Sequence, residues 1–584
     1  MTNLVSGLGE VTREHPDEPA LSFAGEETSY AELWAMSGRF AAGLIDRGIE
    51  PGDPIALYLR NLPQFVVAFH GVLRAGGVVV PINPRYGADE IRPLLQDSLA
   101  GAVVTSTAEV PHVEAVHEDT LLQFLVTADG DKPYSTGFAE FLDSDTEFGF
   151  WEVKNRDDDD LAMLAYTEGP DGEPTGVRLT HGTLESGARA VADLAEVSTD
   201  DAALGALPFS HAAGTTTVMN ATLLGGGTLY PLAQWEPGRA LELLDEHELT
   251  LFHGVPAMFE DLLAHPAADS ADLSSLRLAG ITGPAPDVCR RFEAAFDVPV
   301  HEAYGLTETG GPTHAAVSAD DHRVGSVGTP LAGVEARIVD GSFEELPPVE
   351  EGPVHGEGDG SLGDLADLEE ATGELVLSGA VVMASYHGRE AGGPFTEADG
   401  ERWLHTGDRG YRDENGFVYV LDEEATGEEH ETAGGYRRFV REIEAFLYGP
   451  DAVDDGTDES ADEDAEKAEA EPAGEDTEGP RTLVDLNGVS DNRAESLRAA
   501  GIESIEELRA ASRDDLAEVD GIGDSLADRI KNQVEEDQVE EDQIEEDQIE
   551  EDQIEEDQVE EDQIEEDQVE EDQIEEDQIE DAPE

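Results

Sequence analysis

The chain has 584 residues, of which 136 are acidic and 33 basic, so its formal net charge is −103. This length exceeds what a single hydrophobic core usually organises and predicts several domains. Such a negative charge disfavours general affinity for nucleic acid or for anionic membranes. The sequence has one cysteine, Cys289, which excludes an internal disulfide and fits a reducing compartment.

The N-terminal residues contain no basic segment followed by an apolar run, so we expect no signal peptide. The most apolar stretch, FVVAFHGVLRAGGVVVPI, is interrupted by His70 and Arg74. It therefore predicts a helix followed by a buried strand, with no membrane span. Together these features lead us to expect a cytoplasmic protein.

The first 340 or so residues alternate helical and strand-like patterns. A helix is predicted over SYAELWAMSGRFAAGLIDRGI, ending at Gly48, and short buried strands over PIALYL and GVVVPI. This alternation predicts an α/β fold of layered, largely parallel sheets with helices on both faces. The acidic, glycine-rich stretch 341–372 is interpreted as a surface insertion, after which GELVLSG and GFVYVLD again indicate strands.

The composition changes abruptly at about residue 450. Residues 450–480 are acidic and almost free of large apolar side chains, which predicts a disordered linker. Helical patterning returns over 481–533. The tail, 534–584, repeats a Q-V/I-E-E-D pentapeptide, whose period places its apolar residue on neither a heptad seam nor one helical face. We therefore expect an extended, solvated acidic tail.

The string YTEGPDGEPTGVRLTH, residues 166–181, resembles the phosphate-binding loop Y-T-S-G-T-T-G-x-P-K-G-V-x-x-T-H of the adenylate-forming, AMP-dependent acyl-CoA synthetases. Glycines in such a loop let backbone N–H groups approach phosphate oxygens. Taken alone, the string is equally compatible with an ordinary turn. The resemblance implies nucleotide-binding roles for Thr167, Gly169, Gly172 and Gly176.

Two further strings resemble the same family, VHEAYGLTETGG and WLHTGDRGYRDENGFVYVLD. By this resemblance Tyr304 stacks on adenine and Thr307 contacts the α-phosphate. Glu308 holds Mg²⁺, for which a carboxylate is a preferred oxygen ligand. Thr307 and Glu308 are thus the expected catalytic residues, and Asp408 is expected to bind both ribose hydroxyls. The alternatives are a chance strand and turn for the first string, and a locally capping aspartate for the second.

Weaker strings follow in the family's order. PFSHAAG implies that His211 lies near the acyl pocket, and ITGPAPDV implies that Pro284 and Ala285 lie near the adenine. Each string alone also fits a purely structural role. Their shared order extends the resemblance over roughly the first three-quarters of the chain. It implies a large AMP-binding domain over 1–410 and a remnant of the family's small C-terminal lobe over 411–449.

The phosphate loop and the small lobe depart from the family pattern. Glu168 replaces a serine, Pro170 and Asp171 replace two threonines, and Thr175 replaces the lysine. Two added carboxylates repel a triphosphate, and proline lacks an N–H donor. Glu423 stands where the family hinge has a basic residue, and the G-K motif that carries the family's catalytic lysine does not follow. These changes predict weak adenylation.

Residues 481–533 resemble a tandem helix-hairpin-helix module with hairpins at NGVS and GIGD. In such modules hairpin N–H groups hold a DNA phosphate. Four aspartates flank these hairpins against four basic residues, a balance that disfavours nucleic acid. A small protein-interaction or stabilising domain is the favoured interpretation. The flanking residues are Asp485, Asp491, Asp520 and Asp524, with Arg493, Arg498, Arg529 and Lys531.

The leading hypothesis is an AMP-forming acyl-CoA synthetase. It would convert a carboxylic acid, ATP and CoA, with Mg²⁺, into acyl-CoA through an acyl-adenylate. The second hypothesis is a non-catalytic acyl- or nucleotide-binding scaffold, and the third is a nucleic-acid-associated protein that uses the helical module. The intact Tyr304, Glu308 and Asp408 favour retained nucleotide binding, whereas the altered loop favours the scaffold.

The charge predicts that the globular part folds only in concentrated salt. At about 1 M salt the Debye length falls to about 3 Å, which screens the repulsion between surface carboxylates. Circular dichroism across a KCl series should therefore show loss of the native signal as salt is removed. A native signal that persists down to millimolar KCl would show that the acidity is not a halophilic adaptation.

Overall fold

The computed structural model describes residues 4–449, apart from 131, 145, 155, 170–173, 284, 317–322, 324, 350–370, 389–392 and 422–434, together with the isolated residues 502 and 516. All described residues up to 449 belong to one compact unit, Met1–Glu459. The predictions made for the linker 450–480 and the tail 534–584 lie outside the described residues, as does the helical module apart from those two positions.

An eight-stranded sheet has the order β19-β9-β8-β4-β3-β5-β6-β7. Neighbouring strands from β8 through to β7 run parallel, and β9 and β19 add an antiparallel edge. The strands are β3 (Pro54–Tyr58), β4 (Val78–Pro81), β5 (Ala102–Thr105), β6 (Phe124–Thr127), β7 (Thr136–Gly137), β8 (Leu161–Glu168), β9 (Pro174–Thr180) and β19 (Ser385–Tyr386).

A nine-stranded sheet has the order β16-β15-β14-β13-β12-β10-β11-β1-β2. Its central strands, from β14 to β1, run parallel, and β2, β15 and β16 are antiparallel additions at the two edges. The strands are β1 (Pro19–Phe23), β2 (Glu26–Ser29), β10 (Ala202–Gly205), β11 (Thr228–Pro231), β12 (Leu251–Gly254), β13 (Leu278–Thr282), β14 (Val300–Leu306), β15 (Gly311–Ala315) and β16 (Thr329–Pro330).

A third, antiparallel sheet has the order β17-β18-β21-β20, with β22 paired to β21. Its strands are β17 (Val334–Val339), β18 (Gly373–Gly379), β20 (Phe395–Ala398), β21 (Glu401–Arg412) and β22 (Val418–Val420). The predicted insertion 341–372 connects β17 to β18, and its residues 350–370 lie outside the described part.

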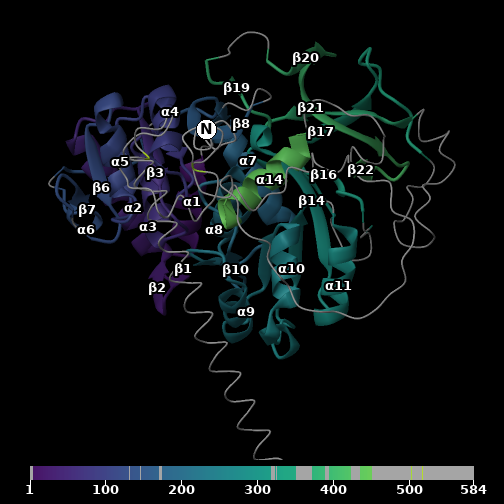
Figure 1. Ribbon diagram of the computed structural model, residues 1–584, viewed down its shortest axis with the longest axis horizontal. Coiled ribbons are helices and arrows are strands. Elements are labelled where there is room, and N and C mark those ends of the chain that lie inside the picture. Colours follow the sequence, from purple (N-terminus) through teal and green to yellow (C-terminus); the bar gives the residue numbers. More distant parts are fainter. Residues whose placement is uncertain are drawn as a thin grey trace, which may run out of the picture. The chain divides into compact units, whose positions relative to one another are not determined.

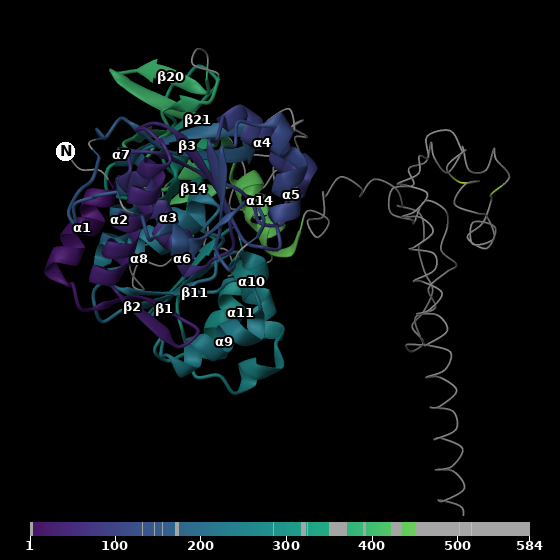
Figure 2. The same ribbon diagram turned by 90° about the vertical axis from the view of Figure 1, so that its left-hand side faces the viewer.

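Helices cover both faces of the large sheets. The helices α1 (Leu4–Glu14), α2 (Tyr30–Asp46), α3 (Pro63–Arg74), α7 (His181–Leu194) and α8 (Ala221–Gly225) pack on one another, and α7 touches β8, β9 and β15, so this layer lies between the two sheets. Figure 2 shows α9 (Pro237–Glu246), α10 (Pro256–Ala264) and α11 (Pro286–Phe296) gathered on the other side of the nine-stranded sheet. The predicted layered α/β fold is thus confirmed in the described residues.

The remaining helical segments include two that cover the outer face of the eight-stranded sheet, α4 (Ala88–Ser98) and α5 (Val110–Val116). The others are η1 (His117–Asp119), α6 (Phe138–Phe141), η2 (Gly214–Asn220), η3 (Pro266–Asp269), η4 (Thr307–Thr309) and α14 (Gly435–Tyr448). No helix in the described ranges has the length and apolar character that a bilayer crossing requires.

Strand β3 shows why the central strands are continuous apolar runs. Ile55 and Leu57 point into the main core, whereas Ala56 and Tyr58 belong to a second core beneath α4 and α5. A strand with helices on both faces buries both sets of alternating side chains, so its sequence shows no polar alternation. Helix α2 begins as its sequence indicates, with Ser29 and Glu32 forming a capping box.

Arg74, which interrupts the most apolar stretch of the sequence, is fully buried at the end of α3. Its guanidinium donates to the Trp34 carbonyl, to the Ser37 hydroxyl at 3.1 Å and to the Phe150 carbonyl at 2.7 Å, and it lies 3.9 Å from the Trp34 ring centroid. Burial lowers the pKa of Arg74 to about 9. This one side chain therefore ties α2 and α3 to the loop at Phe150.

We predict that Arg74→Leu costs about 3–5 kcal/mol of unfolding free energy, because the carbonyls of Trp34, Phe150 and Glu152 each lose a charged donor. Arg74→Lys should also be destabilising, since an ammonium group cannot reproduce the planar fork. Urea unfolding in molar KCl measures both changes. Arg39→Leu, at an exposed position of α2, is the control and should change the free energy by less than about 0.5 kcal/mol. Equal effects of the changes at positions 74 and 39 would contradict this account.

Candidate functional site

The residues that the family resemblance singled out gather where the three sheets meet. Thr167 lies near the end of β8, Tyr304 in β14, and Asp408 on β21, while Thr307 and Glu308 form η4 directly after β14. Helix α14 contacts β8, β14 and β21 and lies among them in Figure 1. Strands β8 and β14 are parallel members of their sheets, so their carboxyl ends face this meeting point, as is usual for ligand sites of α/β folds. We call this region, which α14 occupies, the cleft.

Asp408 and Tyr304 are joined directly. The Tyr304 hydroxyl donates to Asp408 Oδ2 at 2.6 Å, and both side chains are buried. The backbone N–H of Tyr436 donates to both carboxylate oxygens at 3.0 Å. Burial raises the pKa of Asp408 to about 6, although the donors from Tyr304 and Tyr436 oppose that rise. This carboxylate can accept two donors at once, which is the chemistry that a cis-diol requires.

The Tyr436 side chain lies on Tyr304. Their ring centroids are 4.7 Å apart, with an angle of 48° between the planes. The Tyr436 hydroxyl donates to the Ala303 carbonyl at 2.6 Å and accepts the Gly283 N–H at 2.7 Å. A planar ring is thus held by a tilted aromatic neighbour, one backbone acceptor and one backbone donor. This is the set of contacts that an adenine base would need.

Glu308, within η4, is buried and accepts hydrogen bonds from two donors. Its Oε1 accepts from Arg438 Nη2 at 3.0 Å and from the Tyr386 hydroxyl at 2.8 Å. Within the described ranges no group of three or more His, Cys, Asp or Glu side chains forms a metal site. A carboxylate suits Mg²⁺, which commonly takes its other ligands from water and phosphate. Glu308 therefore fits the single protein ligand of a Mg²⁺ that arrives with a nucleotide.

The Glu442 carboxylate is surrounded by hydrogen-bond donors, which we call the donor cradle. It accepts from the Thr167 hydroxyl, from the Glu168 N–H at 2.9 Å and, more weakly, from the Thr307 hydroxyl at 3.4 Å. His211 Nε2 lies 3.5 Å from the same carboxylate. Two hydroxyls and a backbone N–H that converge on one anion also suit a phosphate group.

His211 is buried in the loop after β10, beside the apolar part of the cleft. Its ring centroid lies 4.9 Å from that of Phe439 and 5.4 Å from that of Phe446. A cavity of about 380 Å³ adjoins this region, bounded by α14 on one side and by β4, β8 and α4 on the other. Its volume is within the range of small-molecule pockets. The lining includes Tyr86, Leu94, Tyr166, Ser210 and Phe446.

Some predicted residues take other places. Gly176 lies within β9, where an added Cβ would stand 2.9 Å from Leu164 Cδ1 and 3.0 Å from His387 Cβ, so its absent side chain allows close packing. Gly169 is buried just after β8, and Ala285 is buried at the start of α11. Gly172 and Pro284 lie outside the described residues. Their proposed contacts with a nucleotide stay predictions.

The sequence analysis did not assign site roles to Tyr436, Arg438 and Glu442 of α14, nor to Tyr386 of β19. Apolar residues in α14 follow the spacing of one helical face, which is a signal for an amphipathic helix. These buried residues are Tyr436, Phe439, Val440, Ile443 and Leu447. Tyr386 follows the predicted strand GELVLSG, but nothing in its spacing indicates a bond to Glu308.

Comparison with protein families gives two matches. The family model described as AMP-binding enzyme matches residues 8–387, and the SAM-like helix-hairpin-helix tandem matches residues 480–536. The second match confirms the predicted helical module. The long-chain-fatty-acid–CoA ligase of Bacillus subtilis is 31% identical over 483 residues, which cover 77% of this chain and 81% of that protein. The feruloyl-CoA synthase of an Amycolatopsis species is 31% identical over 450 residues, covering 76% and 82%.

Solved structures show the same fold. The ATP-bound MatB of Rhodopseudomonas palustris superposes with a TM-score of 0.62 at 27% identity, covering 72% of this chain and 78% of that chain. The benzoate CoA ligase of Burkholderia xenovorans superposes with a TM-score of 0.61 at 23% identity, covering 73% and 81%. At this lower identity the likeness concerns the fold alone.

A pH prediction concerns Glu302, two residues before Tyr304. Burial raises the pKa of Glu302 to about 7, although the N–H groups of Gly325 and Ala285 oppose that rise. A carboxyl group whose pKa is raised by folding stabilises the fold below its unfolded pKa, and this contribution is lost as pH rises through 7. The loss from pH 4.5 to pH 8 is on the order of 3 kcal/mol.

Glu302→Gln should therefore lose less stability than the wild type between pH 4.5 and pH 8, in urea unfolding at constant molar KCl. Glu335→Gln, at an exposed position of β17, is the matched control. If the curves of stability against pH for the wild type and Glu302→Gln ran parallel, Glu302 would not be the group responsible.

Proposed function

Because the chain belongs to the AMP-binding enzyme family, we propose that it binds an adenylate in the cleft among its three sheets and adenylates a carboxylic acid only weakly on its own. Its relatives are AMP-forming acyl-CoA ligases. The observation that carries the proposal is the convergence of Tyr304, Asp408, Thr307, Glu308 and Thr167 on one cleft.

In the complete reaction, a substrate carboxylate oxygen attacks the α-phosphorus of ATP, and pyrophosphate leaves. The CoA thiol then attacks the acyl carbonyl carbon and releases AMP. The protein mainly positions these groups and neutralises charge. In this chain Tyr304 would support the adenine and Asp408 the ribose, while the hydroxyls of Thr167 and Thr307 would bind the α-phosphate. Bound Mg²⁺, held at Glu308, would supply the positive charge that offsets the phosphates.

The first step, the attack on ATP, is weakened because carboxylates repel the phosphates. Glu168 is exposed at the end of β8, and its own N–H belongs to the donor cradle, so its carboxylate stands close to where phosphates beyond the first would lie. Two like charges about 4 Å apart near a surface repel by up to ~4 kcal/mol before screening. Thr175, which replaces the family lysine, is buried opposite Thr167 in the β8–β9 pair. AMP, with a single phosphate, avoids most of this repulsion.

The second candidate function is a non-catalytic scaffold that binds an acyl group or a nucleotide. It is favoured by α14, which engages Asp408, Glu308 and Thr167 in the described structure. The helix-hairpin-helix module would then provide contact with a protein partner. With its four flanking aspartates, this module is poorly suited to nucleic acid. The single cysteine and the acidic surface fit a salt-rich cytoplasm.

We predict that the full chain binds AMP more tightly than ATP in isothermal titration with Mg²⁺ in molar KCl. Asp408→Ala should abolish AMP binding, because the ribose loses its acceptor. Glu168→Ser should tighten ATP binding and leave AMP binding nearly unchanged. Glu27→Ser, at an exposed position on the distant strand β2, is the control for removing one surface charge.

The opposite order of affinity would contradict the role given to Glu168. Robust ATP–pyrophosphate exchange by the wild-type chain alone, with any carboxylic acid, would show that adenylation is intact. AMP binding without such exchange is the expected result. The absence of binding by either nucleotide would leave only the scaffold hypothesis.

A further inference from the structure

We propose that α14 is an internal ligand of the adenylate site, one that must leave the cleft before a nucleotide can bind. This inference rests on the proposed adenylate binding and adds a competitor from within the chain. The family match ends at residue 387, so α14 lies beyond the matched segment. The argument depends on which groups α14 contacts, and on how closely it fits them.

Each contact that α14 makes in the cleft corresponds to one part of a bound magnesium adenylate. The Tyr436 ring packs at a tilt against Tyr304, and its hydroxyl hydrogen-bonds to Ala303 and Gly283, where a base is expected. The Tyr436 N–H donates to both oxygens of Asp408, as a sugar hydroxyl would. At the start of the helix, an aromatic ring and a donor thus stand where the base and the sugar are expected.

The two charged side chains of α14 complete the resemblance. The Arg438 guanidinium binds Glu308 at 3.0 Å, where the divalent cation is expected. The Glu442 carboxylate binds Thr167 and the Glu168 N–H, where a phosphate is expected. A buried carboxylate such as Glu308 needs a cation, and a cluster of donors needs an anion. Helix α14 supplies both, so Glu308 and the donor cluster have partners of opposite charge even without a nucleotide.

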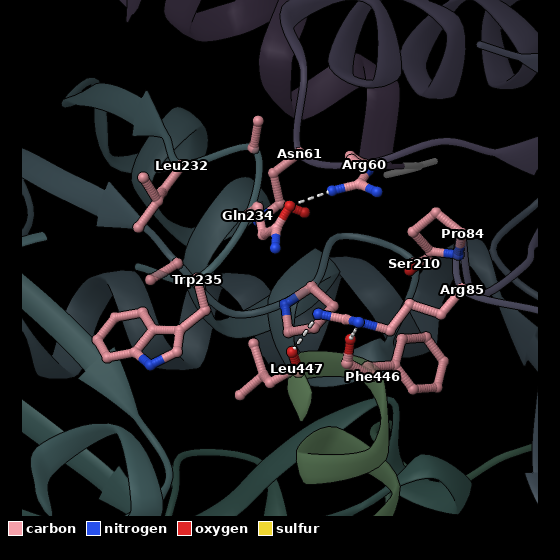
Figure 3. A pocket seen from close by; sticks show the side chains of 13 residues that line it. Arg60, Asn61, Pro84, Arg85, Ser210, Leu232, Gln234, Trp235, Phe446 and Leu447 are labelled. Carbon is pink, nitrogen blue, oxygen red and sulfur yellow. Dashed lines mark hydrogen bonds between the residues drawn. The ribbon is translucent and has the colours of Figure 1, made fainter. Parts of the chain in front are cut away.

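The far end of α14 is held in place as well. Arg85 donates from Nε to the Phe446 carbonyl at 3.0 Å and from Nη2 to the Leu447 carbonyl at 2.6 Å, as Figure 3 shows. A cation at the carboxyl end of a helix satisfies carbonyls that have no helical partner. The Tyr448 hydroxyl donates to Asp261 Oδ2 at 2.6 Å. Both ends of the helix are therefore anchored to the large domain.

The first residue of α14 packs tightly against β21, beside Asp408. A Cβ added at Gly435 would lie 2.6 Å from the Thr406 carbonyl oxygen and 3.4 Å from Asp408 Oδ2. A nucleotide and α14 would contact the same atoms of Asp408 and Tyr304, so only one of them can bind at a time. The apparent association constant for AMP is then the intrinsic constant multiplied by the fraction of molecules whose α14 is undocked.

Hydrogen exchange of the full chain tests this directly, with AMP and Mg²⁺ in molar KCl. A ligand that binds beside a helix slows exchange in it, whereas one that displaces the helix accelerates exchange. We expect AMP to increase the exchange of the amides of residues 435–448 in the wild type. Unchanged or slower exchange in α14 when AMP is bound would overturn the proposal.

Two variants test the same competition through affinity. Gly435→Ala keeps the charge and introduces the clash with Thr406, so α14 should exchange faster without ligand and AMP should bind at least about tenfold more tightly. Arg438→Ala should also tighten AMP binding, although removing a cation would by itself weaken the binding of an anion. Whether Arg438→Ala tightens or weakens AMP binding therefore distinguishes displacement of α14 from a simple electrostatic effect.

The controls are Gly341→Ala, where an added Cβ meets nothing within 4 Å, and Arg337→Ala, which breaks an ion pair with Asp399 on the third sheet. Equal AMP affinity in the wild type, both variants and both controls would overturn the internal-ligand proposal and leave adenylate binding standing. AMP that fails to bind Gly435→Ala, although its α14 exchanges rapidly, would overturn adenylate binding itself.

Discussion

The buried carboxylate of Asp408 is the point at which the nine-stranded sheet, the third sheet and α14 meet. A charged group removed from water persists in a fold only when donors surround it. Here Tyr304 of the nine-stranded sheet and the N–H of Tyr436 on α14 approach a carboxylate carried by β21 of the third sheet. Its pKa of about 6 shows that burial outweighs these donors. Whatever occupies the cleft must therefore bring donors to Asp408.

The same reasoning applies to the charges nearby. Glu308 faces the Arg438 guanidinium, and the donor cradle faces the Glu442 carboxylate. Removing one partner of a buried pair costs far more than exchanging the pair for another. A ligand that displaces α14 must hence deliver a cation and an anion together. A magnesium adenylate does so, whereas a neutral molecule of the same shape would leave Glu308 and the cradle without partners.

The sequence was sufficient to predict the layered fold. Strands such as β3 are buried on both faces, so they appear as uninterrupted apolar runs, and β8 and β14 end at the motifs that contain Thr167 and Tyr304. The bond between Tyr304 and Asp408 was not predictable in detail, because it joins two sheets across 104 residues of chain. Local spacing says nothing about how two sheets pack.

The position of helix α14 could not be predicted from the sequence either. Its apolar spacing indicates one buried face, but a helical face does not specify which surface it covers. The charge of the chain adds a further argument about that surface. Three of the 33 basic residues lie within the 14 residues of α14, and Arg85 holds its far end. Salt that screens the acidic exterior acts less on a buried pair such as Arg438 and Glu308. We therefore expect molar salt to leave the helix in its cleft.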